Sequence, residues 1–164
     1  MTETKFTVPG TPQGKGRARS TTARAGRGRV VVRHYTPAKT RNYESQIKAA
    51  AQKAMQGREL IGGPVKLYIA AIFEPPASWP KWKREAATEG DITHTGKPDL
   101  DNIVKAVKDG MNGAVWCDDS QVAYIDASKL YGETAQVIIR ALPVYGLTPQ
   151  AKQSDYEAFQ DADR

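Results

Sequence analysis

The chain has 164 residues, a formal net charge of +6 and 40% hydrophobic residues, which fits one compact soluble domain and excludes disorder throughout. Its single cysteine, Cys117, excludes an internal disulfide and a cysteine-based zinc site. No apolar run approaches the roughly 18 residues that cross a bilayer, and the first residues lack the apolar run of a signal peptide, so we expect a cytoplasmic protein with no membrane partner.

Positive charge is concentrated at the beginning of the chain. Residues 1–42 contain ten Lys or Arg residues and one acid, Glu3, and so carry a charge of +9. Because a segment of one sign repels itself unless an anionic partner neutralises it, this distribution predicts nucleic acid as the partner. An anionic membrane surface fits less well, because the segment lacks a large apolar face.

The first predicted elements are two short strands. Residues 4–9 alternate polar and apolar side chains, and Gly10 follows the run. Residues 10–29 are rich in Gly, Arg, Thr and Ser and are predicted to form a mobile basic loop, and residues 30–35 a second strand. The sequence therefore predicts a hairpin of these two strands with a long basic tip.

A helix, a buried strand and a shorter helix follow. Apolar residues on one stripe, among good helix formers, predict a helix from Thr40 to Gly57. The nearly continuous apolar run 65–73 contains β-branched and aromatic residues and predicts a buried central strand. Prolines end that run, and residues 79–89 are predicted to form a short helix with an exposed, charged surface.

The last predicted elements are a helix and two strands. The periodicity of residues 100–112 predicts a helix with an apolar core face. Strands are predicted over residues 121–130 and 135–142, joined by the short turn 131–134 as in a hairpin. Residues 147–164 are polar and net acidic, which predicts a flexible tail.

These elements have the order β-β-α-β-α-α-β-β, which predicts an α/β fold of the α+β kind, with helices around one mixed sheet. We expect residues 1–146 to form a single domain. The chain has no Walker A motif and no Gly-x-Gly-x-x-Gly between a strand and a helix, so we expect no nucleotide cofactor.

Two acids, Asp99 and Asp101, mark the start of the predicted helix 100–112. Asp99 follows Pro98 in the natural N-cap position, and Asp101 lies in the first turn. Acids in these places are often only caps and partners of the helix dipole. Both readings stay open from the spacing alone.

The face of this helix opposite its apolar stripe is polar and charged. It carries Asp101, Lys105, Lys108 and Asn112. Because a helix turns by about 100° per residue, these four positions come to lie on the same side. A solvated face with an i,i+4 pair of Asp and Lys explains this pattern as well as a reactive site does.

A second pair of acids, Asp118 and Asp119, precedes the predicted strand 121–130. Asp is common at strand ends, so turn chemistry alone also explains the pair. Because neighbours in an extended chain point to opposite faces, only one of the two can easily join the acids of the helix. The spacing does not decide which.

Clustered carboxylates in a chain with a basic arm favour a magnesium site that hydrolyses phosphodiesters. Mg²⁺ prefers oxygen ligands and keeps several waters, so two or three carboxylates and a substrate phosphate suffice. A bound ion would activate a water, and Lys105 could stabilise the charge that develops on the phosphate or position that water. We expect Mg²⁺, with Mn²⁺ as a substitute ion.

Two blocks of sequence carry a family resemblance. The first is Lys15-Gly-Arg17-Ala18-Arg19 with the later Tyr35-Thr-Pro-Ala-Lys39, and the second is Asp99-Leu-Asp101-Asn-Ile-Val-Lys105 followed by Asp118-Asp119-Ser-Gln121-Val122. In these blocks, and in the order of elements from about residue 5 to residue 142, the chain resembles the RusA family of Holliday-junction endonucleases. It departs from the family pattern at Ala18, where proline is frequent, and in the Arg/Gly-rich insert that runs through residue 29.

The resemblance implies a homodimer that binds four-way DNA junctions and resolves them by paired, symmetric cuts with magnesium, in DNA recombination and repair. It implies Asp99, Asp101 and Asp119 as catalytic acids and metal ligands, with Asp118 as the alternative ligand, and Lys105 as the essential lysine. It also implies DNA contacts at Lys15, Arg17, Arg19 and Lys39, to which we add the basic residues Arg41, Lys97 and Lys108. The near two-fold symmetry of a junction agrees with two equivalent sites in a dimer.

Two other functions stay open. The chain could be a nuclease for other branched DNA or for RNA, which would cut forks or flaps in preference to four-way junctions. It could also be a non-catalytic nucleic-acid-binding module, which would bind in a salt-sensitive way without magnesium-dependent cutting.

Overall fold

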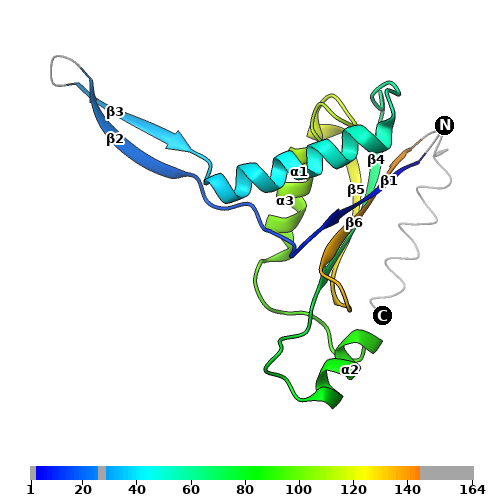
Figure 1. Ribbon diagram of the computed structural model, residues 1–164. Helices are drawn as coiled ribbons and strands as arrows, with labels where there is room; N and C mark the ends of the chain where they lie inside the picture. Colours follow the sequence, from blue (N-terminus) through cyan, green and yellow to red (C-terminus); the bar gives the residue numbers. More distant parts are fainter. Residues whose placement is uncertain (1–2, 26–28, 145–164) are drawn as a thin grey trace, which may run out of the picture.

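The computed structural model describes residues 3–25 and 29–144, so the predicted tail 147–164 lies outside the described residues. The elements, in chain order, are β1 (Thr4–Pro9), β2 (Arg19–Ala25), β3 (Arg29–Tyr35), α1 (Ala38–Met55), β4 (Val65–Phe73), α2 (Lys81–Glu89), α3 (Leu100–Met111), the 3-10 turn η2 (Asp119–Gln121), β5 (Val122–Tyr131) and β6 (Gln136–Pro143). The predicted fold class, an α/β fold with one mixed sheet and helices, is confirmed. The predicted order is also matched, except for one extra strand, β2 (Figure 1).

A four-stranded sheet forms the centre of the domain, with the strand order β1-β6-β4-β5. The predicted central strand, β4, is confirmed: it pairs antiparallel with β6 and parallel with β5. The two closing strands, β5 and β6, are consecutive in the chain but lie on opposite sides of β4, so they do not form the expected hairpin. The physical reason is that β6 is apolar on its core face and takes an inner position between β1 and β4, whereas β5 is mostly exposed and lies at the edge.

The predicted hairpin of residues 4–9 with residues 30–35 is wrong. β1 pairs with β6, where its core residues Phe6 and Val8 are buried, and β3 pairs with β2 in a separate two-stranded sheet. Residues 19–25, predicted as part of a mobile loop, therefore form a strand. The threonines of β2 suit a strand, and Thr22 lies opposite Val32 in the pairing register. This two-stranded sheet projects away from the body of the domain as a long arm (Figure 1).

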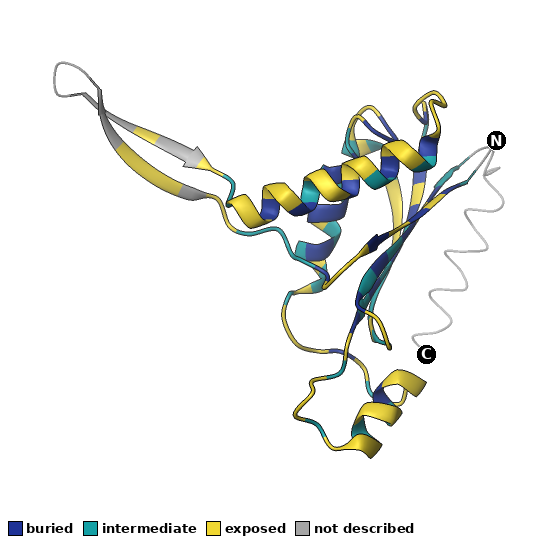
Figure 2. Cartoon of the chain, viewed as in Figure 1, coloured by how far each residue is buried: buried dark blue, intermediate teal, exposed yellow. Residues whose placement is uncertain are grey.

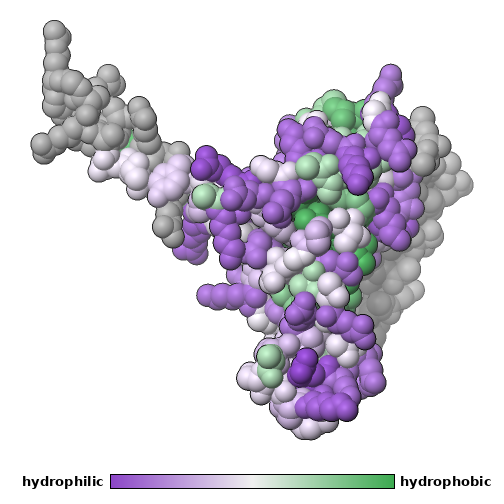
Figure 3. Space-filling view, viewed as in Figure 1, coloured by the Kyte–Doolittle hydropathy of each residue, from purple (hydrophilic) through white to green (hydrophobic). Residues whose placement is uncertain are grey.

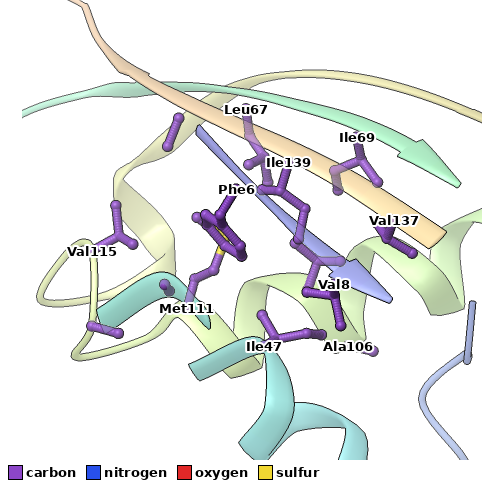
Figure 4. Close-up of a cluster of buried hydrophobic side chains, with 14 of the residues drawn as sticks. Phe6, Val8, Ile47, Leu67, Ile69, Ala106, Met111, Val115, Val137 and Ile139 are labelled. Atoms are coloured by element: carbon purple, nitrogen blue, oxygen red, sulfur yellow. The ribbon is translucent and has the colours of Figure 1, made fainter. Parts of the chain in front are cut away.

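Helices α1 and α3 cover one face of the four-stranded sheet and close the hydrophobic core against it (Figures 1 and 4). The predicted stripe of α1 is confirmed, because Tyr43, Ile47, Ala51 and Met55 are buried while the opposite face of the helix is exposed (Figure 2). The core face of α3 contains Ile103, Ala106, Val107, Gly110 and Met111. Both helices therefore have one fixed face toward the sheet and one free face toward solvent.

The two helices approach most closely at Gly110 of α3. A Cβ atom at this position would lie 2.7 Å from Cβ of Ile47 and 3.0 Å from the carbonyl oxygen of Glu44, which is closer than real contacts allow. The absent side chain lets α3 pack directly on α1. This contact fixes the position of α3, which carries Asp101 and Lys105 and begins directly after Asp99.

None of the helices in the described ranges is long and apolar enough to cross a membrane.

Candidate active site

The beginning of α3 presents the carboxylate of Asp99 without using it as a helix cap. Asp99 occupies the N-cap position with extended backbone angles, φ −66° and ψ 146°, but its side chain makes no capping hydrogen bond. It follows Pro98, whose peptide bond with Lys97 is cis. The capping interpretation is thus not realised for this exposed side chain, and its oxygens are available to another ligand.

Asp101 forms an ion pair with Lys105 one turn further along the same helix. The Lys105 Nζ lies 3.1 Å from Oδ2 of Asp101, and both side chains are exposed, by 60% and 64% respectively. The hydrogen bond from Lys105 holds the pKa of Asp101 below its ordinary value. Asp101 is therefore ionised at neutral pH and lies next to the lysine that the resemblance implies for catalysis.

The two acids of the loop before β5, Asp118 and Asp119, have different partners. The side chain of Asp118 accepts a hydrogen bond from the backbone N–H of Ser120, at 2.9 Å, and so caps η2. Hydrogen bonding to the side chain of Ser120, together with the bond from its backbone, holds the pKa of Asp118 below its ordinary value. Asp119 makes no such bond and instead lies beside Lys108 of α3, with 3.1 Å between Nζ and Oδ2.

Gln121 fixes this loop to the body of the domain. Its side-chain oxygen accepts from the backbone N–H groups of Cys117 and Asp118, at 2.9 and 3.1 Å. Its side-chain nitrogen donates to the carbonyl oxygens of Ile61 and Gly63, at 2.7 and 3.0 Å. The Gln side chain of the Asp-Asp-x-Gln block is thus the part that holds the two acids in place.

The described residues do not form the predicted group of three metal ligands. No three His, Cys, Asp or Glu side chains among residues 3–25 and 29–144 are grouped so that they could hold one ion. Instead, Lys105 neutralises Asp101 and Lys108 neutralises Asp119. The donors themselves, carboxylates at the surface, have the chemistry that Mg²⁺ prefers. Ligation by Asp99, Asp101 and Asp119 therefore remains a prediction.

A basic groove lies beside these acids. Two pockets of about 660 and 400 Å³ share Gln13, Gly14 and Arg17, and together they extend from the start of α3 to the start of α1. Four of the seven predicted DNA contacts line this groove, namely Lys15, Arg17, Lys39 and Lys97. Asp99 lines the same pocket as Arg17 and Lys97, so the structure brings an acid of the candidate site and the basic segment together.

Residues 14–16 line the groove, with a glycine on each side of Lys15. A Cβ atom at Gly14 would lie 2.9 Å from Cβ of Pro98. The backbone N–H of Lys15 donates to the carbonyl oxygen of Asn102 at 2.9 Å, and the N–H of Gly16 donates to Oγ1 of Thr40 at 3.1 Å. Glycines allow this segment to lie directly between the two helix starts.

The predicted DNA contacts outside or at the edge of this groove differ in their surroundings. Lys15 forms an ion pair with Asp109, which raises the pKa of its ammonium group. Arg41 is exposed in the first turn of α1, and Lys108 faces Asp119. The side chain of Arg19 lies outside the described part of the structure.

Lys129 of β5, which the sequence analysis did not identify, holds the backbone segment that precedes Asp99. Its Nζ donates to the carbonyl oxygens of Gly96 and Pro98, at 2.7 and 3.2 Å, directly before Asp99. A lysine inside a strand is the only signal for this role, and the sequence does not show that β5 passes beside residues 96–98.

His94 anchors the same connection by stacking. Its ring lies 3.9 Å from the ring of Phe73, centroid to centroid, and 4.9 Å from that of Tyr131. Burial keeps the pKa of His94 below its ordinary value, and the charge of Lys129 acts in the same direction. The segment that leads into Asp99 is therefore held by a neutral ring and an ammonium group.

Comparison with known proteins places the chain in one family. The model of the family described as "Endodeoxyribonuclease RusA" matches residues 9–141, a range that contains the groove and all four acids. The chain is also 36% identical over 135 residues to "Uncharacterized protein YqaN" of Bacillus subtilis (strain 168), which covers 81% of this chain and 91% of that protein. The chain belongs to the RusA family of endodeoxyribonucleases.

Proposed function

We propose that the protein is a magnesium-dependent endonuclease that resolves four-way DNA junctions by paired cuts. The observation that carries this proposal is the pocket in which Asp99 lies together with Arg17 and Lys97. A phosphodiester bound by the two basic side chains would lie next to the carboxylate. Membership in the RusA family supports endodeoxyribonuclease activity, and a junction is the substrate that the sequence resemblance implies.

The charges at the start of α1 support phosphate binding at the other end of the groove. Lys39 and Arg41 lie in the first turn of α1, which contains no acid. Cations in this place oppose the helix dipole, at a cost of roughly 0.3–1 kcal/mol each at the surface. A bound phosphate would remove this cost, because it interacts favourably with both the cations and the helix N-terminus.

The residues available for magnesium are Asp99, Asp101 and Asp119. Asp118 is the weaker candidate, because its carboxylate already caps η2. Magnesium, when bound, would polarise the phosphoryl oxygen and lower the pKa of an attacking water. Mn²⁺, with the same preference for oxygen ligands, would substitute.

Lys105 and Lys108 hold the acids while no phosphate is present and take part in binding when it arrives. Each ammonium group pairs with one carboxylate, at 3.1 Å. Ligation of an ion by Asp101 would leave Lys105 free to donate to a phosphate oxygen, where it would stabilise the charge that develops during cleavage. Lys108 would do the same beside Asp119.

The reason to expect a homodimer is the proposed reaction, and not a feature of the single chain. Resolution of a junction needs two cuts at positions related by its near two-fold symmetry, and one chain carries one acid site. Two copies related by a two-fold axis would supply the second site in the matching orientation.

Parallel cleavage assays test the proposal. The protein is incubated with equal concentrations of a synthetic four-way junction, a replication fork, a flap, a linear duplex and a single-stranded RNA, with and without Mg²⁺. We expect magnesium-dependent cutting of the junction at paired positions and much slower cutting of the others. If the protein cuts the fork, the flap or the RNA faster than the junction, the proposed substrate is wrong. If it binds these substrates but cuts none of them in any buffer, the proposed endonuclease activity is wrong.

A further inference from the structure

As far as the described residues show, the strands β2 and β3 form an arm whose main contacts are with each other. Its strands pair over seven residues each, from Arg19 opposite Tyr35 to Ala25 opposite Arg29. It extends beyond the start of α1, away from the four-stranded sheet (Figure 1). Among its described side chains, Val32 is 53% exposed and Tyr35 44%. A two-stranded ribbon is marginally stable by itself, so this length of pairing outside the core favours a partner outside the domain.

The charge of the arm identifies the kind of partner. Its two strands contain four arginines and no acid, and no Asp or Glu occurs between Glu3 and Glu44. Hydrophilic surface also gathers where the arm joins the body (Figure 3). The arm is therefore suited to a polyanion as its partner.

The dimensions of the arm fit a groove of duplex DNA. Seven residues per strand span about 23 Å, at roughly 3.3 Å per residue. The major groove is about 12 Å wide and admits a two-stranded ribbon. Small residues such as Ser20, Thr21 and Thr22 keep β2 thin. A duplex offers phosphates on both sides of such a ribbon.

The root of the arm connects it to the candidate site. Residues 17 and 18 enter β2 from the basic groove, and Pro37, which follows β3, lines that groove as well. DNA held beside Asp99 would therefore continue along the arm. At roughly 3.4 Å per base pair, the arm reaches about seven base pairs from its root.

We propose that the β2–β3 arm is a second DNA-binding element, which lies in a groove of a duplex arm of the substrate and reaches about seven base pairs from the basic groove beside Asp99. This inference rests on the proposed function for its substrate. It adds a contact remote from the acids, which supplies affinity and orients the duplex without touching the scissile phosphate.

The test is the salt dependence of junction binding. The variant replaces Arg19, Arg24, Arg29 and Arg33 by Gln, and its control replaces the exposed Lys5, Lys53, Lys81 and Arg84 by Gln, which removes the same charge elsewhere. Dissociation constants are measured for a junction with 20-base-pair arms over a series of salt concentrations. We expect the arm variant to bind more weakly, with the slope of log K against log salt reduced by about 0.9 per lost phosphate contact. The control variant should change the slope much less.

Hydroxyl-radical footprints locate the contact. The wild-type protein should protect sugars about seven base pairs from those that it protects beside the acid site, and the arm variant should lose this remote protection while it keeps that beside the acid site. A variant with Lys in place of the four arginines should restore most of the slope, because phosphate binding needs the charge. Equal loss in the arm and control variants, or an unchanged footprint, would overturn the inference.

The experiments distinguish an error in the proposed role of the arm from an error in the proposed endonuclease activity. If the wild-type protein cuts junctions and the arm variant binds like the wild type, only the second DNA-binding element is wrong. If the wild-type protein binds junctions but never cuts them, the proposed function fails while the footprint still tests the arm.

Discussion

The ammonium group of Lys108 lies 3.1 Å from a carboxylate oxygen of Asp119, and this ion pair joins α3 to the loop before β5. The lysine is one turn beyond Lys105, which pairs with Asp101 in the same way. Two of the three predicted metal ligands are therefore matched by cations from a single helix. While no divalent cation is present, each ammonium group offsets the negative charge of one carboxylate.

Replacement of Lys108 by Met should strengthen the binding of Mg²⁺ to the free protein. The ammonium group competes with a divalent cation for Asp119, and a surface pair of this kind contributes roughly 0.2–1 kcal/mol, which corresponds to at most about a fivefold change. Isothermal titration calorimetry with Mg²⁺ gives the affinity. Lys48→Met, which removes an exposed charge from α1, is the control and should have no effect. Weaker binding by Lys108→Met would contradict the competition.

Separate substitutions of Asp118 and Asp119 distinguish the residue that caps η2 from the residue that is predicted to bind the metal. Asp118→Asn retains an oxygen that can accept from Ser120 N–H, so its cleavage rate should stay within a few-fold of the wild type. Asp119→Asn should lower the rate by about 100-fold or more, since a lost metal ligand removes several kcal/mol of transition-state stabilisation. Single-turnover cleavage of a junction measures both. The reverse order of the two rates would make Asp118 the ligand.

Lys129 is expected to act as a positioning residue for Asp99. Lys129→Met loses the donor to the carbonyl oxygens of Gly96 and Pro98, so the single-turnover rate should fall by about tenfold while the affinity for DNA is unchanged. Lys129→Arg, which can donate to both carbonyls, should recover most of the rate. Lys53→Met, an exposed lysine of α1, serves as the control. A loss of stability in place of a loss of rate would show a purely structural role.

The free energy of unfolding should fall as the pH drops below about 6.5, in part because of His94. Burial holds the pKa of folded His94 below its ordinary value of 6.5. The unfolded chain therefore binds more protons than the folded chain between these two values, and protonation favours unfolding. Urea unfolding at pH 7.5 and pH 5.5 measures this change. The free energy of unfolding should decrease less between these two pH values for His94→Gln than for the wild type. The same loss in both proteins would exclude His94 as a source of the pH dependence.

The helices and most strands could be predicted because each carries its own periodic pattern. The stripe of α1 with Tyr43 and Ile47, and the apolar run of β4, determine their burial locally. Strand neighbours could not be predicted, because pairing depends on contacts between distant segments. Thr4 of β1 lies opposite Ala141 of β6, and no local signal shows this pairing.

The candidate site was predictable in its residues but not in its contacts. Spacing singled out Asp99, Asp101 and the pair Asp118 and Asp119, and only the resemblance favoured Asp119 within that pair. The structure shows that Asp118 is used as a cap and that Asp119 pairs with Lys108. The role of Lys129 depends on β5 passing beside the connection before α3. The strand β2 was missed because Gly and Arg on both sides of it resemble a loop composition.

The most direct measurement is the single-turnover cleavage of a synthetic four-way junction, with Mg²⁺, by the wild type and by Asp101→Asn. The Asn side chain can still accept a hydrogen bond from Lys105 but carries no charge for the ion, so the rate should fall by about 100-fold or more while the junction is bound at least as tightly. Asp91→Asn, an exposed acid outside the site, should cut like the wild type. Cleavage by Asp101→Asn at the wild-type rate would show that the acids at the start of α3 do not carry the reaction.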